Sequence, residues 1–412
     1  MKSSYHKRCL EDTVQSLSDE YAVIVLTGPR QTGKTRMLSE LSRRQERGRS
    51  YVSLDDLVQR ELAKNDPALF LQLHPAPVFI DEIQYAPELF SQIKLMVDRN
   101  GGAGDFWLTG SQPFRLMQLA GETLAGRAAI IHMDPFSMRE ANGLPTEAPF
   151  EVSIDAFLRR QALVPPKPIG DIFNEIWRGF LPGLASGEHR RRDVFFSSYV
   201  QTYVERDVRD LVPTSDPIAF SRLLQAVACR IGQEVNVHEI AKDLGVGDTS
   251  VRTGLGILEK SDIIFYLHPY SANTLKRVVK SPKLYFFDTG LAAYLSRWGS
   301  AETLEAGAMG GAVFENFVVS EIRKSYSQHG LEAPLYYYRD RDGKEIDVVL
   351  EHDGKLFPIE IKKTANPKKE MAASFRMLDK APLERGTGTI VCMVPEVSAI
   401  DSDILLYPAS RL

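Results

Sequence analysis

The stretch that decides the fold is AVIVLTGPRQTGKTRMLSEL, residues 22–41. Its apolar run at 22–26 predicts a buried strand, and the spacing of Met37, Leu38 and Leu41 predicts an amphipathic helix. The loop between them has the pattern G-x-x-x-x-G-K-[ST]. Its glycines let backbone N–H groups turn toward phosphate, and the helix N-terminus adds a favourable dipole. This order of strand, loop and helix predicts a P-loop in a parallel α/β sheet.

The loop residues also predict how a nucleotide is held. Lys34 is expected to reach the β- and γ-phosphates, and the Thr35 hydroxyl is expected to bind Mg²⁺. ATP and Mg²⁺ are therefore the expected cofactors, and the alternative is a glycine-rich turn without nucleotide. The residues expected to line the nucleotide are Gly28, Pro29, Arg30, Gln31, Thr32, Gly33, Lys34, Thr35 and Arg36.

Further predicted strands end in polar residues. One ends in Asp81-Glu82, where Asp81 is expected to hold Mg²⁺ and Glu82 to orient and activate the attacking water. Ligands bind at the carboxyl ends of parallel strands, so Ser111, or else Gln112, is expected near the γ-phosphate or the water. Arg127 is a candidate arginine finger acting in cis or in trans. The alternatives are solvated strand ends and a surface ion pair.

Composition sets the broad class. The 412 residues suggest two or three domains, and 43% hydrophobic with 25% charged residues is typical of a globular protein. The net charge of −4 shows no overall basic bias, so nucleic-acid contact depends on a local patch. Cys9, Cys229 and Cys392 lie far apart, which favours a reducing, cytoplasmic location over a disulfide framework. No long apolar window predicts a membrane span.

The middle of the chain predicts a second kind of fold. Residues 146–215 are expected to form a linker and helical connector. Residues 216–297 have the pattern of three helices followed by a hairpin, which predicts a winged helix-turn-helix. Basic side chains in this segment are expected to contact a DNA backbone rather than to read bases. They are Arg252, Lys276, Arg277, Lys280 and Lys283. The alternative is a winged helix used for protein packing or oligomer assembly.

The last segment, residues 298–412, predicts a small mixed α/β domain. A helix at about 312–326 precedes three strands, and Asp-Gly turns predict hairpins between them. Glu360 and Lys362 are two residues apart on one strand, so their side chains share a face. An E-x-K pattern alone arises by chance about once in a chain of this length. The ordered set of helix, strands and turns is therefore the informative feature.

Several motifs together resemble a prokaryotic ATPase family of the AAA superfamily. GPRQTGKT, FIDEIQ, LTGSQ and LAGR…PFSMRE occur in that family's order and approximate spacing. Further matches at FLPGL, YVQTYVERDVRDL, YFFDTGLAAYL and FENFVVSEI extend the resemblance over almost the whole chain. The resemblance implies a C-terminal domain of unknown function 4143, taken to include the winged helix and the segment after it. It also implies a homo-oligomer, with a ring as one form.

The last segment is also similar to the PD-(D/E)XK nuclease core. Carried over by position, Glu315 is the helix acid, Asp347 the strand acid, and Glu360 with Lys362 the E-x-K. The resemblance implies that the three acids hold Mg²⁺ and that Lys362 positions the attacking water. Three alternatives stay open: an active nuclease, a nucleic-acid-binding module that does not cut, and a purely structural sheet.

The sequence therefore predicts an α/β protein of several domains. These are a P-loop AAA-type ATPase domain (1–145), a linker and connector (146–215), a winged helix-turn-helix (216–297) and a PD-(D/E)XK nuclease-like domain (298–412). The expected activity is Mg²⁺-dependent ATP hydrolysis coupled to DNA binding or remodelling. The alternatives are a signal-transducing ATPase switch with a non-cutting C-terminal module, and a defence or toxin–antitoxin nuclease.

Overall fold

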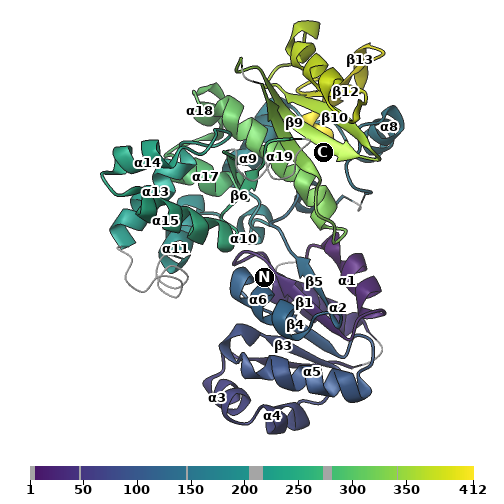
Figure 1. Ribbon diagram of the computed structural model, residues 1–412, viewed down its shortest axis with the longest axis vertical. Coiled ribbons are helices and arrows are strands. Elements are labelled where there is room, and N and C mark those ends of the chain that lie inside the picture. The colour runs from purple at the N-terminus through teal and green to yellow at the C-terminus, as the bar shows by residue number, and fades with distance from the viewer. Residues whose placement is uncertain (1–4, 46–47, 145–146, 204–216, 272–280, 341) are drawn as a thin grey trace. The chain divides into compact units, whose positions relative to one another are not determined.

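A computed structural model describes residues 5–45, 48–144, 147–203, 217–271, 281–340 and 342–412 (Figure 1). The chain divides into two compact units. The first contains residues 1–136 with 260–262 and 327–331, and the second contains most of the remainder. Within the described ranges, no helix has the length and apolar composition needed to cross a bilayer.

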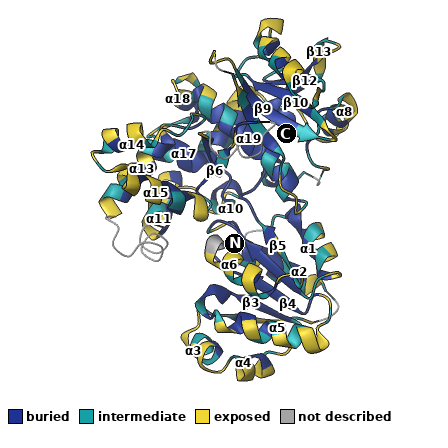
Figure 2. Ribbon diagram, in the orientation of Figure 1, coloured by how far each residue is buried: buried dark blue, intermediate teal, exposed yellow. Residues whose placement is uncertain are grey.

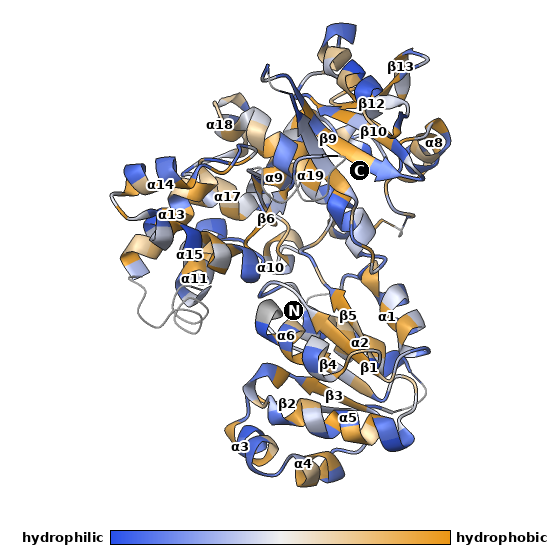
Figure 3. Ribbon diagram, viewed as in Figure 1, coloured by the Kyte–Doolittle hydropathy of each residue, from blue (hydrophilic) through white to orange (hydrophobic). Residues whose placement is uncertain are grey.

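The first unit is built on a five-stranded parallel sheet. Its strands are β1 (Val23–Thr27), β2 (Ser50–Ser53), β3 (Val78–Asp81), β4 (Phe106–Thr109) and β5 (Ala128–His132), in the order β2-β3-β4-β1-β5. Every residue of β1, β3 and β4 is buried (Figure 2). Strands that are buried on both faces need continuous apolar runs, and these three strands are mostly apolar (Figure 3). The parallel α/β domain predicted from the first stretch is present.

Helices cover both faces of this sheet. They are α1 (Leu10–Ser18), α2 (Lys34–Arg44), α3 (Leu57–Asn65), α4 (Pro67–Leu73), the short 3₁₀ helix η1 (Ile83–Tyr85), α5 (Glu88–Asn100) and α6 (Pro113–Thr123). Alternation along β1 separates two cores. Val23 and Val25 lie in the core that α3 to α6 help to form, whereas Ile24 and Leu26 lie in the core with α1 and α2.

The strand order determines which strand ends meet. Strand β4 lies between β1 and β3, and all three run parallel. The loop after β1, the acids after β3 and the polar residues after β4 therefore emerge at the same edge of the sheet. This edge is where an open α/β sheet binds its ligands.

The second unit contains many helices among its described residues. They are α7 (Met138–Ala141), α8 (Ile154–Leu163), α9 (Ile169–Arg178), α10 (Pro182–Ala185), α11 (Arg192–Tyr203), α13 (Pro217–Ala228), α14 (Val237–Leu244), α15 (Asp248–Lys260), α17 (Thr289–Leu295), α18 (Ala301–Ala306) and α19 (Gly310–Ser327). The antiparallel strands β6 (Ile264–Leu267) and β7 (Lys283–Phe286) follow α15. The predicted contacts Lys276, Arg277 and Lys280 lie outside the described residues.

A mixed sheet completes the second unit. Its strands are β8 (Leu335–Arg339), β9 (Glu345–His352), β10 (Lys355–Ile361), β11 (Glu384–Arg385), β12 (Gly388–Cys392), β13 (Ser398–Asp401) and β14 (Ile404–Pro408). The order is β13-β14-β12-β10-β9-β8, with β11 beside β10. Asp353 and Gly354 both have positive φ between the paired residues His352 and Lys355, as a two-residue hairpin turn requires. The 3₁₀ helices η3 (Lys369–Lys380) and η4 (Ala409–Arg411) complete the unit, and η3 packs on one face of this sheet.

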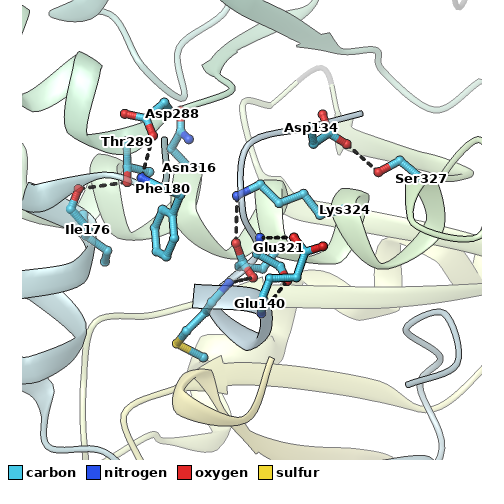
Figure 4. A network of polar contacts seen from close by, with 12 residues as sticks. Asp134, Glu140, Ile176, Phe180, Asp288, Thr289, Asn316, Glu321, Lys324 and Ser327 are labelled. Atoms are coloured by element: carbon cyan, nitrogen blue, oxygen red, sulfur yellow. Dashed lines mark hydrogen bonds and ion pairs between the residues drawn. The ribbon is translucent and has the colours of Figure 1, made fainter. Parts of the chain in front are cut away.

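Buried polar groups fix α19 within this unit (Figure 4). Glu321 and Lys324 form a 2.9 Å ion pair, and the Met138 amide donates to Glu321 at 2.8 Å. Asp288 caps α17 and also accepts a hydrogen bond from the Phe180 amide. Apolar packing continues along the helix, where Phe314 stacks with Phe173. Helix α19 is thus held by contacts with segments far away in the sequence.

Candidate functional sites

Two glycines of the P-loop have a backbone with positive φ. Gly28 has φ +136°, and a Cβ there would lie 2.3 Å from the Met133 carbonyl oxygen. Gly33 has φ +89° and precedes the first residue of α2. Both positions therefore require glycine. The first four amides of α2 have no partners within the helix, so they can donate to an anion at this end.

Lys34 lies inside the loop rather than in solvent. Its Nζ donates to the Gly28 carbonyl at 2.8 Å and to the Pro29 carbonyl at 2.7 Å. Burial lowers the pKa of Lys34 to about 8, against the raising effect of the nearby Glu82 carboxylate. The ammonium group is thus held by weak neutral acceptors, which phosphate oxygens can replace with stronger charge-assisted bonds.

Asp81 ends β3 and collects three hydroxyl donors. Thr35 Oγ1 lies 3.1 Å from its carboxylate, the Tyr51 hydroxyl lies 3.2 Å away, and Thr109 donates a third hydrogen bond. Burial raises the pKa of Asp81, and these hydrogen bonds oppose the rise. A hydroxyl and a carboxylate in contact are oxygen ligands of the kind Mg²⁺ takes. Thr35 and Asp81 therefore fit the predicted Mg²⁺ site.

Glu82 adopts a left-handed conformation with φ 57°. Non-glycine residues held there cost about 1–3 kcal/mol and cluster at functional sites. One oxygen of the Glu82 carboxylate accepts hydrogen bonds from Ser111 Oγ at 2.9 Å and from the Ser111 amide at 3.2 Å. The Gln84 amide group donates to the same oxygen. Ser111 therefore orients Glu82, which places it beside the predicted water-activating group.

Gln84 was not predicted, although it belongs to the FIDEIQ motif. Its side chain is buried, and in the described part of the chain its Oε1 has no hydrogen-bond partner. A Cβ at Gly110 would lie 2.3 Å from that oxygen, so this glycine makes room for the amide. Gln84 and Ser111 together fix the carboxylate of Glu82. Gln112, the second choice for the strand end, comes directly before α6.

The other predicted loop residues have varied surroundings. Thr32 is buried and donates to the Pro29 carbonyl at 2.9 Å. Gln31 has φ 60°, a second left-handed position in the loop. Arg36 lies over the Tyr5 ring at 5.9 Å, and Arg30 is partly buried.

Arg8 was missed by the sequence analysis. Its guanidinium donates to the Thr32 and Asp134 carbonyls, each at 2.8 Å, and lies over the Phe136 ring. It thereby ties the P-loop to the segment after β5. Arginine in an ordinary N-terminal stretch gives no sign of such a role, because its two partners are far away in the sequence.

Arg127 cannot act in cis on this P-loop. It precedes β5, and its carbonyl accepts from the Val23 amide at the amino end of β1, whereas the P-loop follows the carboxyl end. A strand of this length separates the two ends by about 17 Å. Arg127 instead pairs with Asp98 of α5. The cis role is therefore wrong, and the surface ion pair that was its alternative is present.

The C-terminal acids form a cluster that contains lysines. Asp347 accepts from the Ile361 amide at 2.8 Å and pairs with Lys362 at 3.2 Å, and Lys362 also lies 2.6 Å from Glu360. Burial, then Asp347, raises the pKa of Glu360 to about 7. The pKa of Lys362 is raised, because these two carboxylates outweigh the opposing effect of burial.

Glu315 faces a different lysine. Lys283 Nζ lies 3.2 Å from Glu315 and 2.5 Å from Glu345, and the Tyr285 hydroxyl donates to Glu315 at 2.6 Å. Burial raises the pKa of Glu315. Lys283 is only 3% exposed, so its predicted contact with a DNA backbone is wrong.

The predicted metal set of Glu315, Asp347 and Glu360 does not form a recognisable metal site. Among the residues that the structure describes, no three His, Cys, Asp or Glu side chains form a group that could hold a metal ion. The physical reason is that Lys283 and Lys362 pair with the carboxylates. This part of the prediction does not fit a divalent ion. Arg252, the remaining predicted DNA contact, is exposed on α15.

Three families match successive parts of the chain. Residues 20–142 match an AAA domain, residues 169–302 a domain of unknown function (DUF8612), and residues 310–412 a domain of unknown function (DUF4143). The DUF4143 match thus begins downstream of the three-helix segment that the resemblance had assigned to it. The uncharacterised proteins Rv2008c of Mycobacterium tuberculosis and Mb2031c of Mycobacterium bovis are each 29% identical over 347 residues, covering 84% of this chain and 71% of theirs.

Solved structures show a more distant similarity. The Walker-type ATPase paby2304 of Pyrococcus abyssi is 16% identical with a TM-score of 0.45, over 69% of this chain and 94% of that one. AMPPCP-bound DnaA from Aquifex aeolicus is 18% identical with a TM-score of 0.25, over 61% of this chain and 86% of that one.

Proposed function

Because the chain carries an AAA domain followed by a DUF4143 domain, we propose that it is a Mg²⁺-dependent ATPase whose turnover is coupled to binding or remodelling of DNA. The observation that carries the ATPase part is the Glu82 carboxylate. Ser111 and Gln84 hold it at the strand edge where the P-loop and Asp81 also lie.

The proposed reaction uses these groups in distinct roles. The P-loop amides and Lys34 bind the phosphates, and Thr35 with Asp81 would hold Mg²⁺. That ion, when bound, would neutralise charge on the phosphates. Glu82 orients a water molecule and accepts its proton as the water oxygen attacks the γ-phosphorus. The bond from that phosphorus to the β–γ bridging oxygen breaks, which gives ADP and inorganic phosphate.

The DNA part of the proposal rests on the second unit. Helices α13, α14 and α15 followed by the antiparallel pair β6 and β7 have the element order of a winged helix. Arg252 is exposed on α15, the third of these helices. One base-capable side chain favours contact with phosphates over sequence reading.

The wider organisation stays part of the proposal. We retain the four segments 1–145, 146–215, 216–297 and 298–412, a cytoplasmic location and a homo-oligomer, including a ring. In such an assembly Arg127 could serve only a neighbouring subunit, since its own P-loop lies at the other end of the sheet. The alternative of an ATPase switch with a non-cutting C-terminal module gains support from the lysine-paired carboxylates. A defence or toxin–antitoxin nuclease gains none.

The DNA coupling is tested by phosphate release with single-stranded, duplex and junction DNA. We expect at least one DNA form to stimulate ATP turnover in the wild type. Arg252→Glu should weaken this stimulation and leave the DNA-free rate unchanged. Lys242→Glu, an exposed change on the neighbouring helix α14, is the matched control. An equal rate with and without every DNA form would rule out the coupling while leaving the ATPase assignment intact.

A further inference from the structure

Four carboxylates, Glu315, Glu345, Asp347 and Glu360, form the C-terminal carboxylate cluster. Their surroundings do not suit the divalent metal ion that the nuclease resemblance implies. We propose that Lys283 serves as the built-in cation of this cluster and takes the place of a divalent metal ion. The site is then closed to metal-dependent cleavage in the wild-type protein. This inference does not depend on ATP hydrolysis.

The first support is the geometry of Lys283 itself. Its Nζ lies 3.2 Å from Glu315 Oε1 and 2.5 Å from Glu345 Oε1, and the side chain is only 4% exposed. The Tyr285 hydroxyl donates to the same oxygen of Glu315 at 2.6 Å. One carboxylate oxygen of Glu315 is therefore shared by an ammonium group and a phenol. A divalent ion beside this ammonium group would meet strong repulsion in a poorly solvated site.

Lys362 completes the charge balance on the other side of the cluster. It lies 3.2 Å from Asp347 and 2.6 Å from Glu360 Oε1. Each of the four carboxylates therefore contacts a lysine. Glu360 Oε2 is buried and has no hydrogen-bond partner in the described part of the chain. Removal of Lys283 would free the oxygens of Glu315 and Glu345, and Glu360 Oε2 would be a further ligand for an incoming cation.

Backbone pairing on both sides of Lys283 fixes the position of this residue. Lys283 pairs with Leu267 of β6 and bridges to Glu234 on its other side. The Tyr337 hydroxyl of β8 donates to the Ser281 carbonyl at 2.6 Å. The strand that carries Lys283 is thus joined to the C-terminal sheet.

Lys283 also lies outside the DUF4143 match, which begins at residue 310. The matched range contains Glu315, Asp347 and the E-x-K pair, but not the lysine that closes the cluster. The upstream segment, through β7, therefore determines whether the site can take a metal. A module closed in this way could still bind a nucleic acid or partner, but it would not cut.

The test is Mn²⁺ binding to the nucleotide-free full-length protein, followed by electron paramagnetic resonance. The wild type should retain no ion at the cluster. Lys283→Met should gain a bound Mn²⁺, and adding Glu360→Gln to that variant should abolish the gain. Lys355→Met removes an exposed lysine of the same sheet, paired with Glu384, and should behave as the wild type.

Two results would overturn the proposal. One is a Mn²⁺ ion bound by the wild type and lost in Glu360→Gln. The other is a folded Lys283→Met protein, checked by circular dichroism, that gains no ion. If Lys283→Met does not fold, the wild type and Glu360→Gln decide the matter. The proposal is supported if Glu360→Gln does not change the amount of Mn²⁺ bound, because no ion then sits at the cluster, and it is contradicted if Glu360→Gln binds less Mn²⁺ than the wild type.

Discussion

At the scale of single residues, the nucleotide site depends on side chains that never touch the nucleotide in our proposal. Gln84 and Ser111 hold the Glu82 carboxylate, and Arg8 holds the carbonyl of Thr32. Such residues make the active groups rigid, so that little reorganisation is needed when substrate binds.

Arg8 offers a direct test of this positioning role. Arg8→Ala leaves the Thr32 and Asp134 carbonyls without their donor, and losing a buried partner costs about 1–3 kcal/mol. We expect KM for ATP to rise several-fold, with a smaller change in kcat. Lys7→Ala, at an exposed neighbouring position, should leave both constants unchanged. A fall in thermal stability at unaltered KM would mean that Arg8 stabilises the fold and does not position the loop.

Residues also show where reading the sequence succeeds and where it stops. The strands before the P-loop and before Asp81-Glu82 were predictable because each is an apolar run, and both end at the same edge of the sheet. The contacts of Arg8 and Lys283 were not predictable, since their partners are distant in the sequence and one ordinary basic residue looks like another. Lys283 was predicted to contact a DNA backbone, yet folding pairs it with Glu315 and Glu345.

At the scale of elements, α19 is the helix that most depends on long-range contacts. It supplies Glu315 to the carboxylate cluster, and its Asn316 side chain exchanges two hydrogen bonds with the Phe286 backbone of β7. Its buried pair Glu321–Lys324 also binds the first amide of α7. Apolar periodicity predicted the helix, but it could not reveal these polar contacts.

The buried pair makes a stability prediction. Lys324→Met leaves the Glu321 charge buried without its partner, which should lower the free energy of unfolding by about 3–5 kcal/mol. The double variant Glu321→Gln/Lys324→Met should be markedly less destabilised, because no charge is then left unpaired. Chemical denaturation measures both. The exposed pair Lys355–Glu384 provides the control, where Lys355→Met should cost at most about 1 kcal/mol. A double variant as unstable as the single one would refute this explanation.

At the scale of the whole molecule, three family matches cover most of the chain. An AAA domain, DUF8612 and DUF4143 occupy successive parts of the chain. The parallel sheet and the strand-ending acids were predictable because hydrophobic pattern and strand direction decide them locally. Whether the C-terminal acids hold a metal was not, because that depends on a lysine from another segment of the chain.

The central claim is that Glu82 activates water for ATP hydrolysis at the P-loop. The most direct test compares ATP binding and phosphate release in the wild type, Glu82→Gln and Lys34→Ala. We predict that Glu82→Gln binds ATP as tightly as the wild type but releases phosphate at least about 100-fold more slowly. Lys34→Ala should lose binding itself, because the phosphates lose their charged donor. Phosphate release by Glu82→Gln at the wild-type rate would contradict the account.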